Sequence, residues 1–379
     1  MSYSQRQYRG GWNDSSGSFG VLQRFRLDWP LFIGLLALSF FGLVTLYSAS
    51  AQEWGAVLRQ LLRLCLAFGL MLALTQMHPR YLELWTPWFY ILSLILLLAV
   101  LVVGDVGKGA QRWLNLGVMR FQPSEFMKLA VPLMVAWYIR DKHLPPSFMH
   151  IFVILAIILT PVLLIAKQPD LGTAVIVASA GIAVLFLTGV SWWLIGSFVS
   201  LVAAGAPVVW FYLLHDYQRQ RILTFVDPEN DPLGSGYHII QSKIAIGSGG
   251  LYGKGWLNGT QSQLDFLPER STDFIFAVHA EEFGLLGGLA LLGIYVFIVS
   301  RGIGIAYRAQ DTYSRLVAGG LILNFFVYVF INMGMVSGLL PVVGVPLPLM
   351  SYGGTSVVTL LACFGVIMSI HNHRKLLPS

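Results

Sequence analysis

The sequence predicts an all-α polytopic membrane protein with about ten transmembrane helices. Hydrophobic residues make up 56% of the 379 residues and charged residues only 11%, whereas soluble domains carry roughly 25% charged residues. The mean hydropathy is +0.70, and a soluble fold of this length could not bury so much apolar surface. The third observation is that the apolar residues fall in runs close to the length that crosses a bilayer.

The apolar runs divide the chain into a polar tail at 1–27, a membrane domain at 28–375 and a short tail at 376–379. The runs at 123–138 and 172–188 are shorter than the roughly 20 residues that a straight helix needs to cross the hydrocarbon core. The ten runs are 30–49, 57–76, 84–103, 123–138, 148–166, 172–188, 192–214, 273–299, 316–338 and 350–370.

Basic residues in the connections predict the orientation, because cytoplasmic loops carry an excess of lysine and arginine. With both termini cytoplasmic, twelve basic residues lie on the inner side and nine on the outer side, five of these in one large extracytoplasmic loop at 215–272, between spans seven and eight. This even number of spans places the loop at 104–122, the turn at 167–171 and the connection at 339–350 on the outer face as well. The basic residues are spread between apolar runs, which argues against a nucleic-acid partner and favours contact with membrane lipids.

Two polar clusters lie at the edges of apolar spans, where a charged side chain is costly and therefore a candidate functional residue. Near the start of the fourth span, Glu125 and Lys128 are three residues apart and share one helical face. They form either a local ion pair that lets a short helix sit in the bundle or part of a site. Asp170 lies at a break between the fifth and sixth spans. It either caps the next helix or lines a polar cavity, as interrupted helices of membrane proteins often do.

Asp273 lies at the start of the eighth span, next to apolar residues, and has two possible roles. As a structural residue it would be an N-terminal acid favoured by the helix dipole. As a functional residue it would be a partly desolvated carboxylate that accepts a proton.

Glu281 and Glu282, deeper in the same span, are expected to brace the bundle. The glycine-rich turns at 247–255 resemble phosphate-holding loops, although most such turns bind nothing.

Four motifs along the chain resemble those of the SEDS family (shape, elongation, division and sporulation), and the resemblance extends from about residue 28 to 375. The motifs are Gln-Pro-Ser-Glu at 122–125, Gln-Pro-Asp-Leu-Gly-Thr at 168–173, Leu-Pro-Glu-Arg-Ser-Thr-Asp-Phe at 267–274 and Pro-Leu-Pro-Leu-Met-Ser-Tyr-Gly-Gly at 346–354. The prolines and glycines of the last motif prevent a continuous helix, so it is expected to form a lid or a cavity wall. His-Asp-Tyr-Gln-Arg-Gln-Arg at 215–221 is similar to the elongation branch of the family rather than the division branch.

The resemblance implies a peptidoglycan glycosyltransferase that polymerises lipid II at the outer face of the bacterial cytoplasmic membrane. It also implies a class B penicillin-binding transpeptidase as partner, together with other proteins of the elongation complex. Carried over by position, the family's essential aspartate is Asp273, and the supporting residues of its cavity are Glu125, Lys128 and Asp170.

The residues permit an inverting transfer in which a sugar hydroxyl of the acceptor displaces the lipid diphosphate of the donor. Asp273 is expected to act either as general base or as a ligand of a divalent cation, Mg²⁺ or Mn²⁺, held against the diphosphate. Positive charge for the departing diphosphate is expected from Lys128, Arg112, Lys243 and Arg219. A lipid II flippase would also have many spans, broken helices and intramembrane charges, and a scaffold that only anchors its partner is the third alternative.

Overall fold

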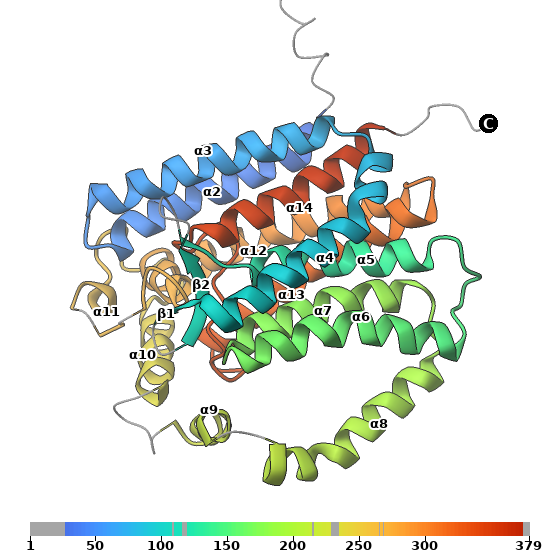
Figure 1. The fold of residues 1–379 in the computed structure, drawn as a ribbon. Coiled ribbons are helices and arrows are strands. Elements are labelled where there is room, and N and C mark those ends of the chain that lie inside the picture. The colour runs from blue at the N-terminus through green and yellow to red at the C-terminus, as the bar shows by residue number, and fades with distance from the viewer. Residues whose placement is uncertain are drawn as a thin grey trace, which may run out of the picture.

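The computed structural model describes residues 27–373 except for 108–109, 116–119, 214–215, 229–234, 265 and 268. The polar tails expected at both ends of the chain therefore lie outside the described residues, apart from Leu27. Most of the described helices lie side by side in one bundle, with a layer of loops and short elements at one end (Figure 1).

Seven of the described helices are long and apolar enough to cross a bilayer. They are α2 (Trp29–Ala49), α3 (Trp54–Gln76), α4 (Pro79–Val103), α6 (Phe148–Lys167), α12 (Ile275–Tyr307), α13 (Thr312–Val336) and α14 (Thr355–Asn372). Three shorter apolar helices are α5 (Ser124–Ile139), α7 (Leu171–Leu187) and α8 (Trp192–Val208). The expectation that the fourth and sixth apolar runs form short helices is confirmed by α5 and α7.

Successive helices of the bundle run in opposite directions, which determines where the connections lie. Both ends of the described chain lie at one end of the bundle, and the long connections lie at the other (Figure 1). The connection between α8 and α12 contains the π-helix η1 (Val209–Leu213), α9 (Asp216–Val226), α10 (Ser235–Ser248) and α11 (Thr260–Gln263). The polar segments that the sequence places on one face therefore do share one end of the molecule.

One connection departs from the otherwise helical fold. After α4, the chain forms a small antiparallel sheet of three strands, β1 (Asp105–Gly107), β2 (Ala110–Asn115) and β3 (Arg120–Phe121). The sequence predicts a loop at 104–122, and the strands differ from that prediction. Strands of two to six residues contain too few alternating positions to be recognised beside apolar runs of about twenty residues.

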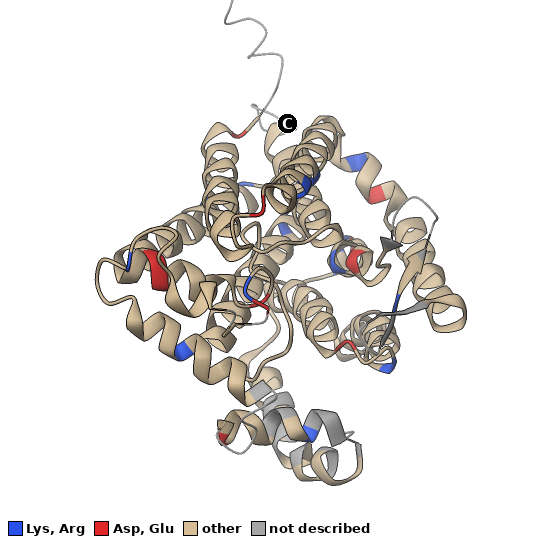
Figure 2. Cartoon of the chain, turned by 90° about the vertical axis from the view of Figure 1, so that its left-hand side faces the viewer, with Lys and Arg blue, Asp and Glu red and all other residues tan. Residues whose placement is uncertain are grey.

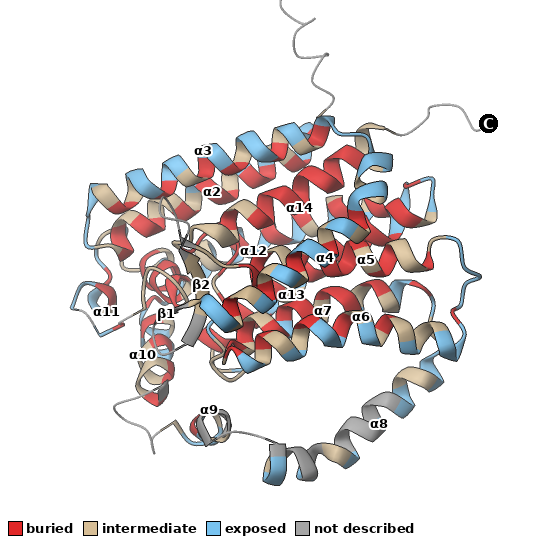
Figure 3. Cartoon of the chain, viewed as in Figure 1, coloured by how far each residue is buried: buried red, intermediate tan, exposed pale blue. Residues whose placement is uncertain are grey.

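The burial pattern is that of a bundle surrounded by an apolar solvent. For α13 and α14, 72% of the most apolar stretch is buried, against 22% for α6, so α13 and α14 are the central helices. Figure 3 shows exposed positions along the outward sides of α3 and α4. Many of these exposed residues are large and apolar, such as Leu66 and Trp88, and charged residues are sparse across the bundle (Figure 2). Such a surface suits lipid rather than water.

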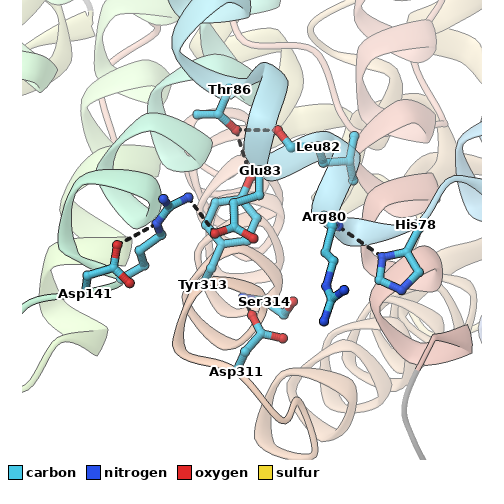
Figure 4. Close-up of polar contacts among 10 residues, drawn as sticks. His78, Arg80, Leu82, Glu83, Thr86, Asp141, Asp311, Tyr313 and Ser314 are labelled. Carbon is cyan, nitrogen blue, oxygen red and sulfur yellow. Dashed lines mark hydrogen bonds and ion pairs between the residues drawn. The ribbon is translucent and has the colours of Figure 1, made fainter.

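Polar contacts join helices at the end of the bundle that holds the termini (Figure 4). Arg140, at the end of α5, pairs with Glu83 of α4. The hydroxyl groups of Tyr313 and Thr86, 2.8 Å apart, join α13 to α4. These contacts lie at the opposite end from the four motifs, so they fix the helices without entering the candidate site.

Candidate functional site

A cavity of about 180 Å³ lies at the loop end of the bundle, where three of the four motif segments meet. The first motif contributes the start of α5, the second the break between α6 and α7, and the fourth the connection between α13 and α14. The motif and neighbouring residues in its wall include Gln122, Glu125, Lys128, Asp170, Gly344 and Gly354. The expectation of a cavity wall built from the proline- and glycine-rich connection is therefore confirmed.

The deepest charged residues of the cavity form a pair within α5. Lys128 Nζ lies 2.6 Å from Glu125 Oε1, and both side chains are buried. The ammonium also donates a hydrogen bond to the hydroxyl of Tyr328 on α13. A buried ion pair requires such extra hydrogen bonds, because desolvation of two charges is expensive. The pair therefore joins α5 to α13, which confirms the local ion pair, and it places a cation in the cavity wall. A part for the pair in a functional site stays a prediction.

Asp170 divides its two carboxylate oxygens between two tasks. Oδ1 accepts from the backbone N–H of Thr173 at 3.3 Å and caps α7. Oδ2 accepts from Gln122 Nε2 at 2.9 Å and lies 3.9 Å from Arg112 Nε. Asp170 is therefore both a helix cap and a cavity residue.

Arg112 reaches the cavity from the small sheet. Its guanidinium donates to the backbone carbonyl groups of Gln168 and Pro169, at the break between α6 and α7. These carbonyl groups follow the last turn of α6, where intrahelical donors run out. Arg112 therefore fixes the broken segment while it leaves a positive charge in the cavity wall.

Asp273 lies at the edge of this cavity, two residues before α12 begins, and is half-buried. A Cβ added to Gly344 would be 3.5 Å from Asp273 Oδ2, and Gly344 is itself a wall residue. Gly344 has a φ of 74°, which only glycine adopts readily. The carboxylate is thus separated from the cavity by a residue that has no side chain.

The remaining two predicted cations lie elsewhere. Lys243, on α10, is exposed and lies against Gly338 after the end of α13. Arg219, on α9, donates to the carbonyl oxygens of Trp210 and Phe211, each at 2.9 Å. Neither side chain lines the cavity, and a part for Lys243 and Arg219 in phosphate binding remains a prediction.

The glycine-rich turn before α11 donates backbone hydrogen bonds to α12. The amides of Lys254 and Gly255 donate to the carbonyl oxygens of Glu281 and Glu282, each at 3.0 Å. These bonds accompany a kink of α12 at Gly284, where φ is 65°. The amides are therefore engaged in supporting a bent helix, so they are not available to hold phosphate oxygens.

The side chains of Glu281 and Glu282 act as the braces that the sequence predicts. Glu281 Oε1 lies 2.7 Å from Lys254 Nζ, which joins α12 to the outer loop. Glu282 accepts a hydrogen bond from the Ser48 hydroxyl on α2. Both carboxylates are buried, so they hold the outer part of α12 against its neighbours.

Sequence reasoning missed two arginines on α3 that border the cavity wall. The Arg63 guanidinium lies 4.7 Å from the ring centroid of Tyr352, and Arg59 Nε donates to the Tyr352 hydroxyl at 3.4 Å. A Cβ added to the wall residue Gly354 would be 3.8 Å from Arg63 Nε. Both arginines fall within or next to the apolar run 57–76, so the cost of a charge in a span, which singled out Lys128, could have found them too.

The two arginines lower the pKa of the Tyr352 phenol. Burial acts to raise the pKa of Tyr352, but the hydrogen bond from Arg59 and the charge of Arg63 outweigh it. The pKa of the Tyr352 phenol therefore lies below its ordinary value. Two arginines that stabilise the anionic form of Tyr352 relative to a free phenol place positive charge beside this edge of the cavity.

A divalent cation would fit this site only together with substrate. Within the described part of the chain, no three His, Cys, Asp or Glu side chains lie close enough to hold a metal ion. Protein-bound Mg²⁺ commonly uses one or two carboxylates, with substrate phosphates and water as its other ligands. Asp273 could supply such a carboxylate, and the phosphates would have to come from the substrate.

A bundle of membrane-spanning helices, with a cavity lined by charged residues of both signs at one end and a carboxylate at the cavity edge, defines a multi-pass membrane protein with a polar site. The family model described as "Cell cycle protein", that of the FtsW, RodA and SpoVE proteins, matches residues 28–376. The chain belongs to this family, the SEDS family. Of the two relatives that follow, the chain is more similar to the peptidoglycan glycosyltransferase than to the sporulation protein.

The chain is 57% identical over 354 residues to the peptidoglycan glycosyltransferase MrdB of Escherichia coli K12, covering 93% of this chain and 96% of that protein. It is 37% identical over 361 residues to the stage V sporulation protein E of Bacillus subtilis, covering 92% and 98%.

Two solved structures share the fold. The first is a peptidoglycan synthase complex in which polymerization and crosslinking are coordinated; its matching chain has a TM-score of 0.80 and 32% identity, over 92% of this chain and 99% of that one. The second is the rod shape determining protein RodA of Thermus thermophilus, with a TM-score of 0.69 and 29% identity, over 92% and 98%.

Proposed function

We propose that this chain is a peptidoglycan glycosyltransferase that polymerises lipid II, and that its active site is the cavity beside Asp273. The observation that supports this proposal most is a half-buried carboxylate at the rim of a cavity whose wall holds Lys128 and Arg112. It occurs in a chain 57% identical to a protein named for this activity. The activity serves elongation of the cell wall and maintenance of rod shape.

The proposed topology has ten spans across the bacterial cytoplasmic membrane, formed by the seven long helices and by α5, α7 and α8. Both termini lie in the cytoplasm, the membrane domain covers residues 28–375, and the cavity opens outward. The basic residues that predict this orientation include Arg140 and Arg308. They lie at the ends of α5 and α12, whereas Glu125 and Asp273 lie at the starts of these helices, beside the cavity. An outward cavity at a membrane rim suits a substrate whose sugars need water and whose isoprenoid needs lipid.

The proposed reaction is an inverting displacement. The 4-hydroxyl of the acceptor sugar attacks the anomeric carbon of the donor, and the bond from that carbon to the diphosphate oxygen breaks. Asp273 takes the hydroxyl proton as general base, a contribution of typically about 10²–10⁴-fold. The electron pair of the broken bond leaves with undecaprenyl diphosphate.

The departing diphosphate needs fixed positive charge, because negative charge develops on it in the transition state. Lys128 and Arg112 supply that charge from within the cavity wall. Arg63 and Arg59 supply it from the adjacent face of α3. Glu125 keeps Lys128 charged and oriented, at a distance of 2.6 Å.

The proposed partner is a class B penicillin-binding transpeptidase, within a larger elongation complex. Support comes from the similar structure of a synthase complex that coordinates polymerization with crosslinking. A polymerase that produces uncrosslinked strands needs such an activity beside it, since glycan strands alone do not form a continuous wall.

Reconstitution tests this function against the alternatives of a flippase and a scaffold. The purified chain, with its transpeptidase partner, is incorporated into vesicles that contain fluorescent lipid II, and products are separated by gel electrophoresis. We expect a ladder of glycan strands that a muramidase digests. Translocation of lipid II without strand growth would instead support a flippase. The absence of both strand growth and translocation would support a scaffold.

A further inference from the structure

Asn332 binds the backbone of Asp273 directly. This asparagine lies on the central helix α13 and is completely buried. Its Nδ2 group donates one hydrogen bond to the backbone carbonyl of Asp273, at 2.9 Å, and another to the carbonyl of Val345, at 2.7 Å. Val345 is a wall residue of the cavity, so a single amide group links the carboxylate-bearing residue to the cavity wall.

Ser351 binds the backbone of the residue before Asp273. Its hydroxyl donates to the carbonyl oxygen of Thr272 at 2.6 Å and accepts from the backbone N–H of Leu347 at 2.7 Å. The backbone N–H of Tyr352 donates to the carbonyl oxygen of Ser271 at 2.8 Å. The carbonyl groups of three consecutive residues, ending at Asp273, are therefore all held by the same two neighbouring segments.

These hydrogen bonds are important because the segment before α12 is not part of a regular helix or strand. α12 begins at Ile275, so the carbonyl groups of residues 271–273 precede the helix and depend on other donors. Donors from α13 and from the proline- and glycine-rich connection decide where this segment lies. A shift of about 1 Å in a catalytic group can cost on the order of 10²-fold in rate.

Asparagine at position 332 has a cost in folding free energy. Its Oδ1 atom is buried and has no hydrogen-bond partner within the described residues. A buried polar atom without a partner costs about 1–3 kcal/mol. An apolar residue at this place would avoid that cost, but it could not hold two carbonyl groups at a fixed separation.

We infer that Asn332 and Ser351 are positioning residues for the transfer reaction. Asn332 holds Asp273 at the rim of the cavity through its backbone carbonyl, and Ser351 holds the preceding residue, Thr272, in the same way. The inference rests on the proposed function, because it assigns the two residues to the same site. It adds that the central helix and the connection after it determine the geometry of the carboxylate, although neither Asn332 nor Ser351 lines the cavity.

The experiment compares Asn332→Ala and Ser351→Ala with Asn324→Ala. Asn324 is a matched control because it is also buried on α13 but bonds to Ser179 of α7, at 3.1 Å. Each full-length variant is purified with the transpeptidase partner, and initial rates of glycan polymerisation are measured against lipid II concentration and pH. We expect kcat of the two positioning variants to fall by about 10–100-fold, with KM changed less than about threefold. We also expect the acidic limb of their pH profile to move.

Two further comparisons separate positioning from plain destabilisation. Ser351→Thr keeps the hydroxyl and should retain more activity than Ser351→Ala at the same thermal stability. The Asn324→Ala variant should lose stability while its kcat and its pH profile stay those of the unchanged chain. Equal loss of kcat in Asn324→Ala and Asn332→Ala, or an unmoved pH profile in Asn332→Ala and Ser351→Ala, would overturn the inference. Failure of the unchanged chain to polymerise lipid II would instead overturn the proposed function.

Discussion

The Nζ atom of Lys128 lies 2.6 Å from Oε1 of Glu125 within one helix, and both side chains are about 5% exposed (6% and 5%). The pair has a second anchor in Tyr328 of the central helix α13. Because the pair is buried at membrane depth, loss of one member leaves a charge without its counter-ion, which costs about 3–5 kcal/mol. The arrangement makes it possible to separate bracing from catalysis by mutation.

We expect Glu125→Gln and Lys128→Met each to lower the unfolding temperature in detergent, whereas the double variant regains much of that loss. Replacement of a buried pair by neutral residues is often close to neutral for stability. Polymerisation should remain impaired in the double variant, since the cation at the cavity is still missing. The measurements are thermal unfolding and initial rate on the same preparations. If the double variant polymerises normally, the pair serves only to brace α5.

Asp273→Asn should abolish polymerisation with little effect on folding or partner binding. Asparagine keeps the size of the side chain but cannot accept a proton as a base, so a loss of about 10²–10⁴-fold is expected. Asp227→Asn is the matched control and should keep its rate, because Asp227 is an exposed carboxylate in the same connection between α8 and α12. High Mg²⁺ or Mn²⁺ should not restore Asp273→Asn. Partial recovery at high cation concentration would favour the role of a metal ligand.

Arg112→Gln should lower kcat/KM by about 10–100-fold, because a charge-assisted hydrogen bond contributes about 1.5–3 kcal/mol. Arg112→Lys should lie between Gln and the unchanged chain, since lysine keeps the charge but loses the planar fork that spans two carbonyl groups. Arg308→Gln, exposed at the other end of the bundle, is the control. Steady-state rates at varied lipid II concentration decide the matter. A normal rate for Arg112→Gln would show that Arg112 does not stabilise the departing diphosphate.

Gly284→Ala should destabilise the protein strongly, whereas Gly288→Ala on the same helix should not. At Gly284 φ is 65°, and an added Cβ would be 2.3 Å from the backbone nitrogen of Gly253. At Gly288 an added Cβ has no heavy atom within 4 Å, and alanine there favours the helix by up to about 1 kcal/mol. Thermal unfolding in detergent provides the comparison. Equal unfolding temperatures for the two variants would show that the kink is not fixed by this contact.

Several parts of the site were predictable because they depend on local sequence. Charged residues next to apolar runs singled out Glu125, Lys128 and Asp170, and the structure places all three in one cavity. The same reasoning applied to Arg59 and Arg63 would have found the arginine edge as well. The alternatives for Asp170 could not be resolved in advance, because a carboxylate has two oxygens and only the fold shows that each has a different partner.

By itself, the sequence determined the helical membrane class and the positions of the short helices, because an apolar run satisfies its backbone hydrogen bonds locally as a helix. It also determined the family, through motifs that can be read in order along the chain. The tertiary structure alone decided which motifs meet. The backbone carbonyl groups of Asp273 and Thr272 are held by Asn332 and Ser351, 59 and 79 residues further along the chain. Lys243 and Arg219 lie outside the cavity. Such contacts depend on how helices pack against each other, and packing partners leave no periodic signal in the chain.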